Sequence, residues 1–310
     1  MILDLLMIAA GLLLLVLAGD ALVKGAVNLS LRLGVPPLIV GLTVVAFGTS
    51  APELLVSVEA VLDNAPALAL GNVVGSNIAN ILLVLGVPAL IAAVPVSREL
   101  THDFLMMMAA AVFFIALAFV GPFSWIHGLA LLAGLVAMLW NSYARAQAHR
   151  ASAEADLEGA DASISGQKIA LYLLGGVIGL PLGANLLVDG AVNVATVLGV
   201  SEAVIGLTLV AVGTSLPELA TTVAAALRRQ AGVAMGNVIG SNMFNLLGII
   251  GIASLVGNIP VPEQMLQTDL WVMLAVSALL GVFVLTGRSI GRLAGAALIA
   301  LYGVYLVQLF

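Results

Sequence analysis

The chain alternates between long apolar runs and short polar stretches. Most of the runs are long enough to cross about 30 Å of hydrocarbon as a helix, which rises about 1.5 Å per residue. Run length predicts ten membrane-spanning helices, at residues 2–22, 36–60, 67–93, 103–120, 124–144, 167–189, 202–227, 231–257, 268–286 and 290–309. The first run has no basic residue before its apolar segment, so we expect a retained helix rather than a signal peptide. The pattern therefore predicts an all-α membrane protein.

The polar stretch at residues 145–166 divides the predicted helices into two sets of five. It is rich in Ala, Ser and charged residues and has no apolar periodicity, which is typical of a solvated linker. We therefore expect three parts: a first five-helix repeat at residues 1–144, a cytoplasmic polar linker at 145–166 and a second, inverted five-helix repeat at 167–310.

Each predicted half contains a copy of one motif. Residues 41–86 read GLTVVAFGTSAPELLVSVEAVLDNAPALALGNVVGSNIANILLVLG, and residues 206–251 read GLTLVAVGTSLPELATTVAAALRRQAGVAMGNVIGSNMFNLLGIIG. Aligned without a gap at an offset of 165, the copies are identical at 24 of 46 positions. Because each half has an odd number of helices, the second copy would enter the membrane from the opposite side. Inverted repeats are typical of secondary transporters, whose sites lie at the midplane where the repeats meet.

Composition agrees with a membrane location. Hydrophobic residues make up 62% of the chain and the mean hydropathy is +1.22. Charged residues make up 8% of the chain, against about 25% in a soluble domain, so the composition excludes an ordinary soluble domain. There is no Cys, which excludes disulfides, thiolate metal sites and thiol redox chemistry.

The charges also predict an orientation. With ten spans, every basic residue falls on one side of the membrane: Lys24, Arg32, Arg98, Arg145, Arg150, Lys168, Arg228, Arg229, Arg288 and Arg292. The other side contains acidic residues only: Asp4, Asp63, Asp189, Glu202, Glu263 and Asp269. Because basic residues are retained in the cytoplasm, we expect both termini to lie outside.

The candidate chemistry centres on two acidic residues, Glu53 and Glu218, which fall in the middle of predicted spans. A carboxylate at that depth costs at least a few kcal/mol unless it is paired, protonated or bound to a cation. No Lys or Arg is predicted at that depth, which leaves a protonated structural Glu or a cation site. Pro52 and Pro217 precede the two Glu residues and would interrupt the helices. We expect discontinuous helices there, with carbonyl groups freed at residues 46–49 and 211–214.

The second half of each motif adds neutral oxygen atoms. Ser76 and Asn80 are four residues apart on one helical face, as are Ser241 and Asn245. Oxygen ligands favour Ca²⁺, Na⁺ or Mg²⁺ over metals that prefer His or Cys, and Mg²⁺ gives up its water reluctantly. Two carboxylates match the charge of one Ca²⁺ or two Na⁺. The sequence therefore favours a cation transport site over a phosphate loop, since no Lys follows the glycines.

At GTSxPE and GNxxGSNxxN the chain closely resembles the calcium/cation antiporter superfamily, specifically its prokaryotic sodium/calcium exchanger branch. The resemblance implies an antiporter of the inner membrane that works by alternating access through sliding of its first and sixth helices. It implies that Glu53 and Glu218 bind Ca²⁺ directly, helped by the carbonyl groups of Thr49 and Thr214. It further implies Na⁺ sites formed by Ala46, Ser50, Ser76, Asn80, Ala211, Ser215 and Ser241. We expect no cofactor, nucleic acid or obligatory protein partner besides the transported ions and the lipid bilayer.

Several alternatives remain open. Many relatives, including potassium-dependent exchangers, have Asp where this chain has Asn245, so we hypothesise that transport does not require K⁺. This departure also leaves the exchange stoichiometry open. A proton/calcium antiporter would use the same two Glu residues as proton carriers. An intramembrane protease with Ser50 or Ser215 as nucleophile would need a base, and no His or Lys is predicted nearby.

Overall fold

The computed structural model describes residues 1–148, 163–199 and 211–308. In the first half the helices are α1 (Ile2–Leu33), α2 (Pro37–Val40), η1 (Gly41–Val45), α3 (Ala46–Thr49), α4 (Ala51–Leu62), α5 (Pro66–Leu82), α6 (Gly86–Ile91), η2 (Arg98–Leu100), α7 (Thr101–Val120) and α8 (Trp125–Ala148). In the second half they are α9 (Gly166–Val197), α11 (Ala211–Gly213), α12 (Leu216–Leu227), α13 (Ala231–Met243), η5 (Phe244–Ile249), α14 (Ile250–Val256), η6 (Met265–Asp269), α15 (Leu270–Thr286) and α16 (Arg292–Gln308). The described part of the chain is therefore all helical apart from connections and two isolated bridges.

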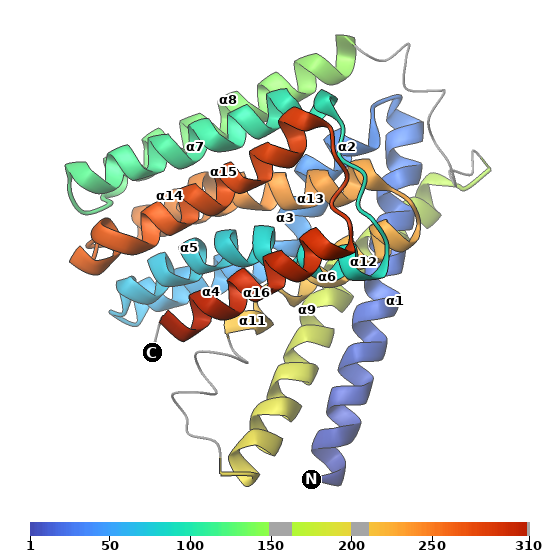
Figure 1. Cartoon of the computed structure of the whole chain (residues 1–310), viewed down its shortest axis with the longest axis horizontal. Helices are drawn as coiled ribbons and strands as arrows, with labels where there is room; N and C mark the ends of the chain where they lie inside the picture. Colours follow the sequence, from blue (N-terminus) through green and yellow to red (C-terminus); the bar gives the residue numbers. More distant parts are fainter. Residues whose placement is uncertain (149–162, 200–210, 309–310) are drawn as a thin grey trace.

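Two long helices, α1 and α9, lie side by side and project together from the remaining helices (Figure 1). Small residues allow their backbones to approach closely. A Cβ atom added to Gly11 would lie 2.6 Å from the backbone nitrogen of Leu187, and one added to Gly183 would lie 3.0 Å from that of Leu15. Large apolar side chains on the other faces of α1 are exposed, as expected for a helix in contact with lipid.

Both helices are longer than hydropathy predicts. Helix α1 continues past residue 22 to Leu33, and α9 continues past residue 189 to Val197. The predicted ends were wrong because hydropathy marks where a helix leaves the apolar layer, whereas polar residues continue the backbone hydrogen bonds. An (i, i+4) ion pair of 3.0 Å between Asp20 and Lys24 accompanies this extension.

The helices break at the GTSxPE motifs, as predicted. Pro37–Thr49 and Ala51–Leu62 are bent by 44°, and Ser50 between them has a non-helical backbone (φ −86°, ψ 5°). Ser215 has nearly the same angles (φ −90°, ψ 3°) before α12. In each copy a Pro occupies the first turn of the following helix, where its missing N–H leaves no donor unsatisfied.

Within the described ranges, seven helices are long and apolar enough to cross a membrane, and an eighth is added if the bent pair counts as one span. Two further apolar helices, Leu216–Leu227 and Arg292–Gln308, are shorter. Part of the predicted span at residues 202–227, and most of the predicted linker, lie outside the described residues. Ten spans therefore remain a prediction.

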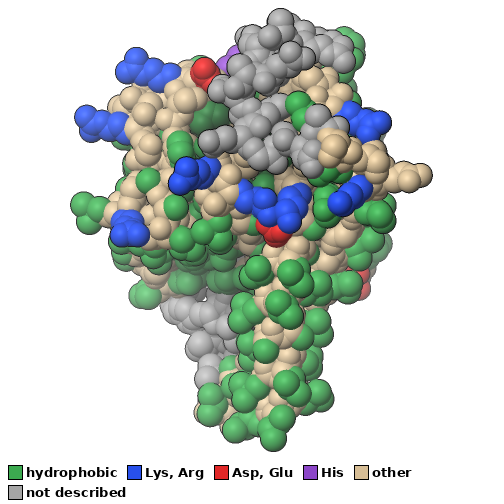
Figure 2. All heavy atoms as spheres, turned by 90° about the vertical axis from the view of Figure 1, so that its right-hand side faces the viewer, with side chains coloured by type: hydrophobic (Ala, Val, Ile, Leu, Met, Phe, Trp, Pro, Cys, Tyr) green, Lys and Arg blue, Asp and Glu red, His purple; other side chains and the backbone are tan. Residues whose placement is uncertain are grey.

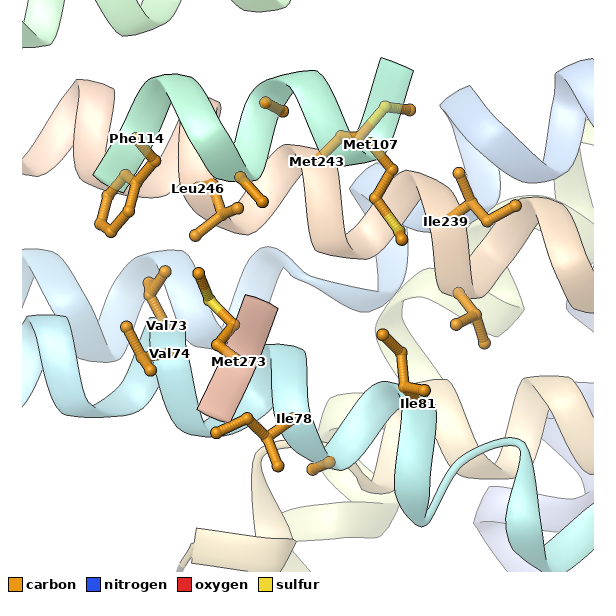
Figure 3. Close-up of a cluster of buried hydrophobic side chains, with 14 of the residues drawn as sticks. Val73, Val74, Ile78, Ile81, Met107, Phe114, Ile239, Met243, Leu246 and Met273 are labelled. Atoms are coloured by element: carbon orange, nitrogen blue, oxygen red, sulfur yellow. The ribbon is translucent and has the colours of Figure 1, made fainter. Parts of the chain in front are cut away.

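The core lies among helices α5, α7, α13 and α15, where aliphatic, Met and Phe side chains meet (Figure 3). Lys and Arg side chains gather on one face of the molecule, whereas apolar side chains cover the projecting part below (Figure 2).

Candidate cation-binding site

Glu53 and Glu218 each lie in the first turn of a half-helix, directly after the break in the chain. Both side chains are completely buried, with 0% exposure. The N-terminus of a helix carries a partial positive charge, which stabilises a nearby carboxylate. The hydroxyl of Ser50, three residues before Glu53, contacts the carboxylate of Glu218. The fold thus brings the two predicted acidic residues, 165 positions apart, into one buried place.

A serine links the two copies of the motif. Ser50 donates a hydrogen bond of 3.0 Å to Oε1 of Glu218. The S-x-x-E spacing of Ser50 and Glu53 is that of a capping box, yet neither α4 nor α12 has a side-chain cap. The hydroxyl of Ser50 is directed to the carboxylate of the other copy instead of to its own helix.

Thr49 makes a second link between the copies. Its Oγ1 donates to Asn237 Oδ1 at 3.1 Å and lies 3.4 Å from Ser241 Oγ. The same atom is 3.3 Å from the carbonyl oxygen of Ala46, which also accepts from the backbone N–H of Ser50 at 3.0 Å. The predicted residues Ala46, Thr49, Ser50, Glu218 and Ser241 are therefore together in space.

Two Asn residues outside the predicted set hold the half-helices in place. Asn72 donates to the carbonyl oxygen of Glu53 at 3.2 Å and to Ser57 at 3.0 Å. The equivalent Asn237 donates to the carbonyl oxygen of Glu218 at 3.4 Å and to Thr222 at 3.1 Å. A signal for this role was present in the sequence, because these Asn residues follow each Glu at the same distance in both copies.

Several buried polar atoms of the two motifs have no hydrogen-bond partner. They are both carboxylate oxygens of Glu53, Oε2 of Glu218, Oγ of Ser215, Oδ1 of Asn77, Oδ1 of Asn80 and both amide atoms of Asn245. Buried polar atoms without partners are costly. All but one of these atoms are oxygens, and three belong to carboxylates. Such a set suits a hard cation, which binds oxygen ligands.

The other predicted residues are placed as follows. Ser76 is 3% exposed, and Asn245 is fully buried in the π-helical turn η5. Thr214 lies in the break before α12. Ala211 begins α11, but its side chain is outside the described residues. Across the described ranges, no three His, Cys, Asp or Glu side chains gather into a metal cluster, so the two Glu residues provide the acidic part of the site.

Comparison with known proteins identifies the family. The model of the sodium/calcium exchanger protein family matches residues 3–144 and 168–310, which is nearly the whole chain. The chain belongs to the sodium/calcium exchanger family. It is therefore a transport protein rather than an enzyme, and the sequence-based assignment is confirmed.

Known relatives align with most or all of this exchanger-family chain. Sodium/calcium exchanger MaX1 of Methanosarcina acetivorans is 33% identical over 98% of both chains. Inner membrane protein YrbG of Escherichia coli is 36% identical over 87% of this chain and 85% of its own length. A solved structure of the sodium-calcium exchanger NCX_Mj superposes with a TM-score of 0.84 at 34% identity, covering 100% of this chain and 99% of that one. The fold is thus that of a multi-pass exchanger, and the chain is a cation/calcium antiporter.

Proposed function

We propose that this antiporter exchanges Na⁺ for Ca²⁺ across a prokaryotic inner membrane. The observation that carries the proposal is that three carboxylate oxygens of two fully buried Glu residues, Glu53 and Glu218, have no hydrogen-bond partner. One Ca²⁺ balances two carboxylates, and two Na⁺ do the same. Competition of different ions for the same charges is what coupled exchange requires.

We further propose the ligand set and the arrangement of the chain. The cation ligands are Ala46, Thr49, Ser50, Glu53, Ser76, Asn80, Ala211, Thr214, Ser215, Glu218, Ser241 and Asn245. Ten spans form two inverted repeats at residues 1–144 and 167–310, and both termini lie outside. The matching hydrogen bonds of Asn72 and Asn237 support equivalent roles for the two copies. Alternating access would expose the site to each side in turn.

Transport without K⁺ is part of the proposal. At position 245 the chain has Asn, so the part of the site that the structure describes contains two carboxylates and no third one. A third cation therefore has no additional acidic residue to balance its charge. If exchange were abolished by removing K⁺ from both sides, this part of the proposal would be wrong.

The test is reconstitution in liposomes loaded with Na⁺, followed by uptake of radiolabelled Ca²⁺ from Na⁺-free medium. K⁺ is omitted, and an ionophore collapses any pH gradient. We expect uptake that needs internal Na⁺ and both Glu residues. Uptake that follows an imposed pH gradient and ignores Na⁺ would instead identify a proton/calcium antiporter with the same site.

A further inference from the structure

Two Met side chains accept hydrogen bonds from Asn amides in the second motif. Asn242 Nδ2 lies 3.7 Å from the sulfur of Met107, and Asn77 Nδ2 lies 3.7 Å from the sulfur of Met273. Met107 is on α7 and Met273 on α15, and each is 1% exposed. Both side chains enter the buried cluster near α5 and α13 (Figure 3). Each contact joins an Asn of one half of the chain to a Met of the other.

A thioether sulfur accepts hydrogen bonds and cannot donate them. Met107 therefore determines which end of the Asn242 amide faces it, namely the NH₂ group. The oxygen of Asn242 then points the other way, where it accepts a hydrogen bond of 3.0 Å from Nδ2 of Asn80. This second bond turns the NH₂ group of Asn80 toward Asn242. The oxygen of Asn80 therefore points away from Asn242, and it is buried without a hydrogen-bond partner.

We propose that Met107 is a positioning residue, which acts through Asn242 to make Asn80 present its oxygen, and not its NH₂ group, to the transported cation. The inference rests on the proposed function, since it assigns a cation to Asn80. An amide in the opposite orientation would place two partially positive hydrogens where the cation binds. The relay Met107–Asn242–Asn80 therefore contributes to the preference of the site for positive charge.

The other Met begins an equivalent relay. Asn77 occupies the position of Asn242 in the first copy, and Asn245 occupies that of Asn80. Met273 holds the NH₂ group of Asn77, which leaves the Asn77 oxygen buried without a partner, as are both amide atoms of Asn245. A bond from Asn245 Nδ2 to this oxygen would complete the relay and leave the Asn245 oxygen for a cation.

Packing and hydrogen bonding make different demands at position 107. Core packing requires a side chain of about the right volume, which Leu provides. The relay requires an acceptor, which Leu lacks and Gln provides. For Met107→Leu we expect the KM for Ca²⁺ to rise by about three- to tenfold with a maximal rate within about twofold of the wild type. For Met107→Gln we expect a KM close to that of the wild type.

The control is Met243→Leu, which changes another buried Met of the same cluster (7% exposed). It should alter neither KM nor the maximal rate. A lower maximal rate with unchanged KM in Met107→Leu, or an equal loss in Met107→Gln, would show that position 107 serves packing alone and would overturn the proposal. An Asn242→Leu background gives a further check, because there Met107→Leu should add no further loss. Additive losses would contradict the relay.

Equilibrium binding of radiolabelled Ca²⁺ to the purified full-length protein separates this inference from the proposed function. If the wild type binds Ca²⁺ but shows no Na⁺-driven flux, the proposed exchange is wrong, and the relay is judged by the binding constants of the same variants. If flux is present and Met107→Leu binds Ca²⁺ as tightly as the wild type does, the relay is wrong and the exchange stands. If the wild type binds no Ca²⁺, both are overturned.

Discussion

The two glutamates have the same sequence surroundings but different contacts. Glu218 accepts a hydrogen bond from Ser50, and its half-helix is tied through Asn237 to Thr49 of the other copy. Glu53 has no hydrogen-bond partner on either carboxylate oxygen, and the hydroxyl of Ser215, the counterpart of Ser50, has none either. One oxygen of Glu218 is thus held by the protein, whereas both oxygens of Glu53 are left for a cation to satisfy.

The difference shows that a repeated motif does not produce a symmetric site. The second half of the motif is also asymmetric, but in the opposite sense, because Asn80 of the first copy is bonded to Asn242 whereas neither amide atom of its counterpart Asn245 has a partner. Each copy therefore combines a side chain that is fixed by a hydrogen bond, Glu218 or Asn80, with one that has no partner, Glu53 or Asn245. The predictions below test whether the two copies differ in function as they do in contacts.

The largest effect is expected from the carboxylates themselves. Glu53→Gln and Glu218→Gln should each lower Ca²⁺ uptake at low Ca²⁺ concentration by about 100-fold or more, because each removes half of the charge that balances the ion. Glu59→Gln is the matched control, since Glu59 is on the same helix as Glu53 but is exposed. Liposome uptake measures all three variants. Near-normal uptake in Glu53→Gln would mean that the Glu53 carboxylate does not bind the ion.

The second-largest effect is expected on stability, when either of the two Asn residues that hold the half-helices is replaced. Asn237→Ala removes contacts to the Glu218 carbonyl, Thr222 and Thr49 and should destabilise the fold by about 2–3 kcal/mol. Asn72→Ala removes two contacts at a less buried position and should cost about 1–2 kcal/mol.

Thermal unfolding of the purified protein measures both losses, with Asn193→Ala as the control. Asn193 also makes a side-chain hydrogen bond, to Asp4, but at an exposed position, so its loss should change the midpoint little. Equal midpoints for Asn72→Ala and Asn237→Ala would contradict the asymmetry described above.

The two serines give a third comparison. Ser50→Ala should raise the KM for Ca²⁺ by about tenfold, because it removes a hydrogen bond to a buried carboxylate. Ser215→Ala removes a hydroxyl without a hydrogen-bond partner and should change the KM less. Concentration dependence of uptake gives both values. A larger loss in Ser215→Ala would indicate that the ion-bound state uses the opposite set of contacts.

The sequence was sufficient for the features that depend on local pattern. Apolar runs predicted the helices, and Pro52 with Glu53 predicted both a break and a buried acidic residue. The hydrogen bonds between the two copies could not be predicted in the same way. Since Ser50 and Ser215 are identical in their motifs, the sequence does not say which hydroxyl reaches the opposite carboxylate. That choice depends on how α4 and α12 pack in three dimensions.

Other features had weaker signals or none. Asn72 and Asn237 are repeated at one spacing, so their positioning role could have been inferred. Met107 resembles any core Met, and its contact with Asn242 appears only once the helices are packed. The π-helical turn at Asn245 has no Pro to mark it, and the first copy continues as α-helix at the corresponding Asn80. Here the two copies differ through packing and not through motif.

The smallest effect is expected at a surface ion pair that one copy has and the other lacks. Arg228 at the end of α12 lies 2.5 Å from Asp20 of α1, whereas the positions equivalent by the offset of 165 are Asp63 and Asn185. The pair is about one-third exposed on both sides, so Arg228→Gln should cost no more than about 1 kcal/mol, less at high salt. Thermal unfolding at low and high NaCl concentration measures this loss. A loss of stability as large as that of Asn237→Ala would mean that the exposed pair contributes as much as the buried network. Part of the difference between the copies would then lie in their surface contacts.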